Sequence, residues 1–103
     1  MAFFGTTVSE KEAVQILKEG GTVTVTATED AYGSTSGIKG LWLMTATDAQ
    51  GNTYSVRIAQ KSTIKKYKTP TGLFSFYDAA GFTEAKVPMK AGGSVTLSLP
   101  TEP

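Results

Sequence analysis

One hairpin constrains the fold more than any other part of this sequence. Within residues 40–60, two runs of apolar and β-branched residues flank the turn sequence DAQGN. Gly51 and Asn52 in this turn can take positive φ at little cost, which is typical of hairpin turns. The sequence therefore predicts a mainly β fold that is organised around this pair of strands.

The alternation of side chains along the hairpin predicts which residues face the core. A symmetric register, with Thr47 opposite Thr53, buries three residues of the first strand: Trp42, Met44 and Ala46. Leu41 and Leu43 then lie outside, whereas a single β-bulge would turn the tryptophan outward. The apolar residues expected in the core from the whole chain are Val25, Val56, Ile58, Phe74, Val95 and Leu97.

A short helix is expected at the start of the chain. Ser9 and Glu12 form an S-x-x-E capping box, in which each side chain satisfies a free backbone amide at a helix start. Apolar residues follow at helical spacing, and Gly20-Gly21 ends the pattern. The sequence therefore predicts a helix over residues 9–19.

The remaining segments predict three more strands and two irregular stretches. Alternating or apolar residues predict strands over residues 22–28, 73–77 and 94–100. Glycine and serine predict a loop over residues 29–37, and the lysine-rich residues 61–69 predict a short helix or a basic loop. We expect a single domain over residues 1–103.

The order of strand, long loop, hairpin, short connector and final strands resembles the OB-fold. The segments that carry this resemblance are TVTVTAT, LWLMTATDAQGNTYSVRI and AGGSVTLSLP. It covers roughly residues 20–100 and implies a small five-stranded Greek-key barrel over residues 22–100, preceded by one helix. The chain departs from the pattern in that helix and in its short connector. An SH3-like barrel or a small β-sandwich stays open as an alternative.

The absence of cysteine and histidine limits the chemistry that this chain can perform. Without them there is no thiolate nucleophile and no zinc–cysteine site, and the commonest general base and transition-metal ligand is missing. We therefore expect no catalytic residues, no metal and no cofactor. The lack of cysteine fits a reducing compartment, and no apolar stretch approaches the length of a membrane span. We expect a cytoplasmic protein without membrane contact.

The net charge of +1 conceals an asymmetry along the chain. Residues 1–55 carry three cations against six acids, and residues 56–103 carry seven cations against three acids. Between Arg57 and Lys68 there are five cations and no acid, with Tyr67 among them. Clustered cations bind phosphates, and aromatic rings stack on the bases of single strands.

Two functional hypotheses follow from these features. The first is non-catalytic binding of single-stranded DNA or RNA by a surface of Arg57, Lys61, Lys65, Lys66, Tyr67, Lys68, Tyr77, Tyr32 and Trp42. Tyr67 is expected to face solvent, while Trp42 is either a stacking platform or a core residue. The second is a structural or protein–protein interaction module, or a homo-oligomer, that uses Leu41, Leu43 and strand edges. The alternative to a binding function is that the lysine-rich segment is a solvated connector with no partner.

Overall fold

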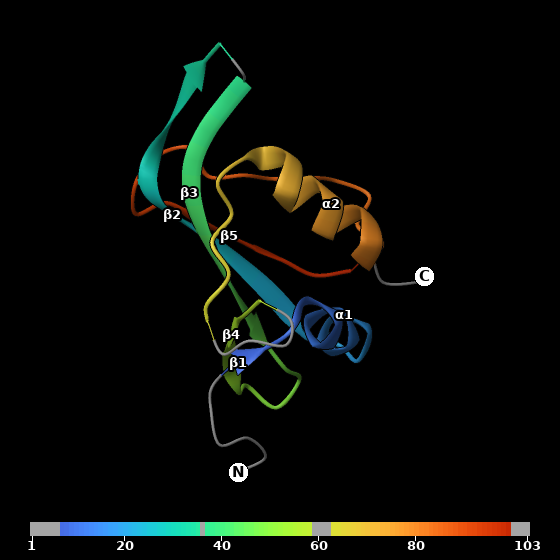
Figure 1. Ribbon diagram of the computed structural model, residues 1–103. Coiled ribbons are helices and arrows are strands. Elements are labelled where there is room, and N and C mark those ends of the chain that lie inside the picture. Colours follow the sequence, from blue (N-terminus) through green and yellow to red (C-terminus); the bar gives the residue numbers. More distant parts are fainter. Residues whose placement is uncertain (1–6, 36, 59–62, 100–103) are drawn as a thin grey trace.

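The computed structural model describes residues 7–35, 37–58 and 63–99, which form a five-stranded mixed sheet and two helices (Figure 1). The strands are β1 (Thr7–Val8), β2 (Thr22–Ser34), β3 (Gly37–Thr47), β4 (Thr53–Val56) and β5 (Ser94–Leu97). The helices are α1 (Glu10–Lys18) and α2 (Pro70–Ala80). The predicted mainly β fold is confirmed, and the capping box of Ser9 and Glu12 is present at the start of α1.

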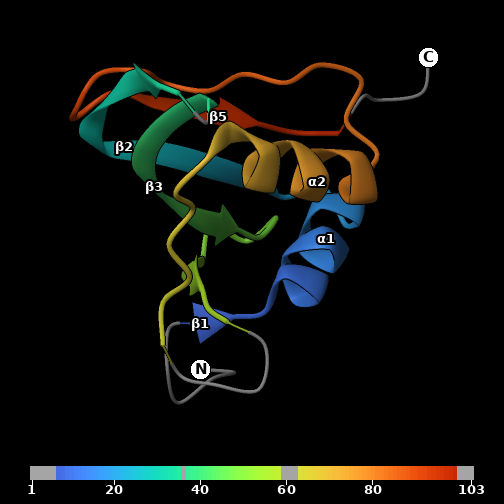
Figure 2. The same ribbon diagram turned by 45° about the horizontal axis from the view of Figure 1, so that its top comes forward.

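The strands lie in the order β1-β4-β3-β2-β5. β1 pairs with β4 in parallel, and the other neighbouring strands are antiparallel. β1 and β5 are the two edges of the described sheet, so the sheet is not closed and the expected barrel is not confirmed. Figure 2 shows both helices on one side of the sheet. We call the opposite side the uncovered face, because no helix of the described residues lies on it.

The centre of the sheet is a long hairpin of β2 and β3. Its ladder runs from Thr22 opposite Thr47 to Ser34 opposite Gly37, with register shifts on either side of Glu29. The expected loop over residues 29–37 is therefore wrong for residues 29–34 and for Gly37, because the ladder continues through the shifts as far as Ser34 opposite Gly37. This hairpin carries Tyr32 and Lys39 opposite each other on its outer part.

The predicted register of the second hairpin, between β3 and β4, is confirmed. Thr47 lies opposite Thr53, and their hydroxyl oxygens are 3.0 Å apart. Trp42, Met44 and Ala46 are fully buried, as the alternation of side chains predicts. The pairing does not continue to Ile58, because β4 ends at Val56. Ile58 is 38% exposed, so its expected place in the core is wrong.

The largest difference from the sequence-based prediction is α2, which replaces the strand expected over residues 73–77. Pro70 occupies the first turn, and Gly81 ends the helix at a φ of 96°. The buried residues follow helical spacing: Leu73, Phe76, Tyr77 and Ala80. Phe74 falls between them and is 46% exposed, so its expected place in the core is wrong.

The core lies between the helices and the covered face of the sheet. Ala13 and Leu17 of α1 and the buried residues of α2 pack with the inward side chains of β2 and β3. Val25 and Val56 are buried as predicted, whereas Val95 and Leu97 of the edge strand β5 are only partly buried.

Candidate nucleic-acid interface

The described part of the lysine-rich segment, residues 63–69, is neither a helix nor a free loop, because some of it pairs with β3. The Trp42 N–H donates to the Tyr67 carbonyl oxygen (2.8 Å), and the Tyr67 N–H donates back to the Trp42 carbonyl oxygen (2.9 Å). The Gly40 N–H donates to the Lys68 carbonyl oxygen (3.1 Å). Because side chains alternate along an extended chain, Tyr67 points into the core while Lys66 and Lys68 are exposed.

Tyr67 forms a cluster with two charged residues. Its ring is 3% exposed, and its hydroxyl donates to the Glu10 carboxylate in the first turn of α1. Lys65 Nζ lies 3.2 Å from Glu10 Oε1 and 5.2 Å from the centre of the Tyr67 ring. Burial, together with the hydrogen bond and the negative charge of Glu10, raises the pKa of Tyr67 above its ordinary value.

The prediction that Tyr67 faces solvent is therefore wrong. A large ring next to β3 is stabilised by burial, and Glu10 supplies the hydrogen-bond partner that a buried tyrosine needs. Lys65 is also partly neutralised, since its ammonium group already pairs with Glu10. The Tyr67 ring is therefore not placed to contact a ligand, whereas Lys65 lines a separate hollow of about 560 Å³ with Glu10 and Lys11.

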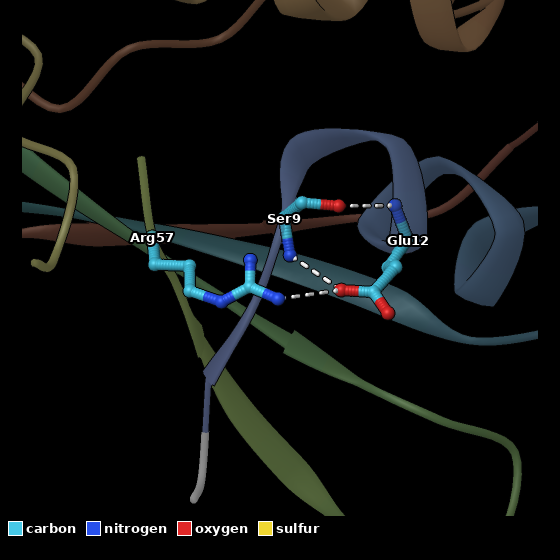
Figure 3. A network of polar contacts seen from close by, with 3 residues as sticks. All are labelled: Ser9, Glu12 and Arg57. Carbon is cyan, nitrogen blue, oxygen red and sulfur yellow. Dashed lines mark hydrogen bonds and ion pairs between the residues drawn. The ribbon is translucent and has the colours of Figure 1, made fainter. Parts of the chain in front are cut away.

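Arg57 belongs to a contact between the end of β4 and α1 (Figure 3). Its Nη2 lies 3.4 Å from Glu12 Oε1, and the same oxygen accepts a hydrogen bond from the Ser9 N–H (2.8 Å). The Glu12 N–H in turn donates to Ser9 Oγ (3.1 Å). The carboxylate that caps the helix thus also holds the guanidinium group.

Trp42 and Tyr77 are core residues that hold the segment after α2. The Trp42 ring is fully buried, and its Nε1–H donates to the Pro88 carbonyl oxygen (2.7 Å). Tyr77 is 2% exposed, its hydroxyl donates to the Lys86 carbonyl oxygen (2.8 Å), and burial raises the pKa of Tyr77 to about 12. Of the two roles considered for Trp42, the core role is confirmed. The expected stacking role of Tyr77 is wrong, because its ring does not reach solvent.

The remaining predicted residues come together at one place. Tyr32, Lys66 and Lys68 line a hollow of about 420 Å³ with Lys39, and its other lining residues are Glu29, Gly40 and Leu41. Tyr32 is 57% exposed. Within the described residues, none of these three lysines forms an ion pair. Lys61 lies outside the described residues.

Sequence reasoning missed Lys39, because the outer part of the β2–β3 hairpin was expected to be an irregular loop. Tyr32 lies opposite Lys39 in the ladder, and directly opposite residues of an antiparallel pair share a face. Leu41 and Leu43 are partly buried, and both point away from the buried Trp42 and Met44. Leu41 contributes an apolar wall to the hollow.

Comparisons with protein-family models, curated proteins and solved structures give no match. Any inference about function therefore rests on the residues that line the hollow. No helix in the described part of the chain is long and apolar enough to cross a membrane. The described residues also contain no group of three or more histidine, cysteine or acidic side chains that could hold a metal ion. Three ammonium groups beside an exposed phenol ring are suited to phosphate binding and base stacking.

Proposed function

We propose that this protein binds single-stranded nucleic acid without catalysis, in the cytoplasm, through the hollow between Tyr32 and Lys68. The observation that carries the proposal is the convergence of Lys39, Lys66 and Lys68, which have no ion pair among the described residues, on an exposed aromatic ring. The lysines would neutralise phosphates, and Tyr32 would stack on a base. Glu29 lines the same hollow and lowers its net charge, so we expect weak, salt-sensitive binding.

The resemblance to OB-folds supports the class of ligand. OB-folds bind oligonucleotides on the face of their second and third strands and on the neighbouring loops. In this chain the corresponding face belongs to the hairpin of β3 and β4, and Leu41 of β3 lines the hollow. An OB-like arrangement of the strands is part of this proposal.

Salt dependence of binding tests the proposal directly. We expect a fluorescein-labelled oligothymidine to bind with a slope of log K against log salt of about −2, since three phosphate contacts contribute about −0.7 each. Lys66→Ala or Lys68→Ala should each reduce the slope by about 0.7. Tyr32→Ala should weaken binding by about 1–3 kcal/mol and leave the slope unchanged. Fluorescence anisotropy at several salt concentrations measures all four quantities.

Two control variants separate this surface from non-specific attraction. Lys90 is exposed and lies outside the hollow, and Arg57 pairs with Glu12, so Lys90→Ala and Arg57→Gln should leave the slope unchanged. Absence of binding at low salt would refute the proposal. An equal loss of affinity in Lys90→Ala and Lys68→Ala would also contradict it.

A protein–protein interaction module is the second candidate function. The observation that favours it is the edge strand β5, whose residues Ser94–Leu97 carry no charge. Uncharged edges pair readily with other strands.

A further inference from the structure

The hollow proposed for nucleic acid contains one carboxylate, that of Glu29. Glu29 is exposed, and its side chain makes no hydrogen bond or ion pair with another described residue. Lys39, Lys66 and Lys68 line the same hollow and do not pair with this carboxylate. One acid and three bases in a single hollow thus leave both kinds of charge available to a ligand.

Strand positions keep the acid and the bases apart. Glu29 lies opposite Leu41 in the β2–β3 ladder, so their side chains share a face. On the other side of β3, Trp42 lies opposite Tyr67 in an antiparallel bridge. The adjoining residues Leu41 and Lys68 therefore lie side by side. Neighbouring strands are about 4.8 Å apart, so about 10 Å separates the backbones of Glu29 and Lys68, with Leu41 between them.

An aromatic ring lies next to this row of residues. Tyr32 is opposite Lys39, and Lys39 is two residues before Leu41 in β3, so both rows face the same side of the sheet. A base that stacks on the exposed Tyr32 ring and lies over Leu41 can direct one edge to Glu29, while its phosphate lies on the lysine side. The hollow is therefore complementary to a nucleotide whose base carries hydrogen-bond donors, since phosphate alone would leave the carboxylate without a partner.

The chemistry of a carboxylate distinguishes between the bases, because it accepts hydrogen bonds and cannot donate them. Guanine presents two neighbouring donors on its Watson–Crick edge, the N1–H and the N2 amino group, and these match the two carboxylate oxygens. Adenine and cytosine present one amino group beside an acceptor nitrogen, and thymine and uracil present one N–H between two carbonyl oxygens. Paired hydrogen bonds to a charged acceptor are also the strong ones. Guanine is therefore the base that suits Glu29 best.

We propose that Glu29 selects guanine in the single strand that this hollow binds, by accepting from the N1–H and from the N2 amino group of the base. This inference rests on the proposed nucleic-acid binding and adds a base preference to it. Water competes for the oxygens of an exposed carboxylate, so we expect guanine to be preferred over thymine by about tenfold, towards the lower end for a paired contact to a base edge.

Competition between short single strands tests the preference. Fluorescein-labelled oligothymidine is displaced by unlabelled oligothymidine, by an alternating thymine–guanine strand and by an alternating thymine–inosine strand of the same length, and fluorescence anisotropy gives each affinity. Half of the registers of the alternating strand place a guanine in the hollow, so we expect it to bind about fivefold more tightly than oligothymidine. Inosine lacks the N2 amino group, so its strand should lie between the other two.

Glu29→Gln separates base selection from the effect of charge. The variant removes a negative charge and keeps one acceptor oxygen, so oligothymidine should bind more tightly while the advantage of the thymine–guanine strand falls below about twofold. Asp30→Asn is the matched control, because it removes the same charge from the next residue, which does not line the hollow. Asparagine keeps an acceptor for the Ala91 N–H that Asp30 binds (2.8 Å), so this variant should retain the fivefold advantage.

The outcomes distinguish this inference from the proposed function. Failure of every strand to bind at low salt would refute nucleic-acid binding and the base preference together. Equal affinities for oligothymidine and the thymine–guanine strand would refute the preference alone. If Glu29→Gln strengthened binding of both strands equally and kept the advantage of guanine, Glu29 would act only through its charge, which would overturn the inference. An inosine strand that bound as tightly as the guanine strand would contradict the contact with the N2 amino group.

Discussion

Replacing Tyr67 by phenylalanine removes one hydroxyl and leaves the ring in the core. A hydrogen bond to a charged acceptor contributes about 1.5–3 kcal/mol to stability. The Glu10 side chain is 35% exposed and stays paired with Lys65, so water and the ammonium group compensate for part of the loss. We expect Tyr67→Phe to lower the free energy of unfolding by about 1–2 kcal/mol.

Urea denaturation followed by far-ultraviolet circular dichroism measures this change. Tyr32→Phe is the matched control, because it removes a hydroxyl from a ring that is 57% exposed and should change stability by less than about 0.5 kcal/mol. Combining Tyr67→Phe with Glu10→Gln isolates the coupling between the two side chains. We expect the double variant to be more stable than the sum of the two single losses implies.

The same variant separates a structural role from a binding role for Tyr67. If the ring is buried as described, Tyr67→Phe keeps its affinity for oligothymidine at low salt. A stability change below about 0.3 kcal/mol would show that the hydroxyl does not bond to Glu10 in solution. Loss of binding with unchanged stability would show that the Tyr67 ring reaches the ligand, and would contradict the buried cluster.

Two further predictions concern the core. Val56 is fully buried and Ile58 is 38% exposed, so Val56→Ala should lower the free energy of unfolding by about 1–3 kcal/mol and Ile58→Ala by less than about 1 kcal/mol. Urea denaturation that ranks them in the opposite order would contradict the described end of β4. Burial raises the pKa of Tyr77 from 10.0 to about 12, so its contribution to stability is complete below about pH 10 and is lost as the pH rises through about 12. As the pH rises from about 10 to about 12, the free energy of unfolding of Tyr77→Phe should fall less than that of the wild type. Identical pH profiles of the two proteins would show that the pKa of Tyr77 is not raised by folding.

The parts of the fold that the sequence predicted correctly are set by neighbouring residues. The capping box joins Ser9 to Glu12, and the second hairpin joins Thr47 to Thr53 across a short turn that Asp48 stabilises by accepting from the Asn52 N–H (2.9 Å). Such contacts depend on spacing along the chain, which a single sequence displays. The same alternation of side chains correctly placed Trp42 in the core.

The parts that sequence reasoning missed depend on contacts between distant segments. The aromatic run at Phe74 and Phe76 favours a strand by residue type, yet the packing of α2 against the core requires helical spacing. Tyr67 looked exposed among its lysines, because its partner Glu10 lies in α1, 57 residues earlier in the chain. The candidate site also differs from the predicted one for this reason. Pairing of Tyr67 and Lys68 with β3 places Lys66 and Lys68 in one hollow with Lys39, which is distant from them in the sequence.

The uncovered face of the sheet has a consequence for how its strands are held together. It presents hydroxyl pairs such as Thr24 with Thr96 and Thr47 with Thr53. Within each pair one hydroxyl donates to the other, so every pair keeps one O–H free to bond water or another molecule. Threonine therefore serves two purposes here, because its branched side chain suits a strand while its hydroxyl links neighbouring strands across the face. The links tie β5 to β2 and β4 to β3, so they support the register of the sheet from the face that carries no helix.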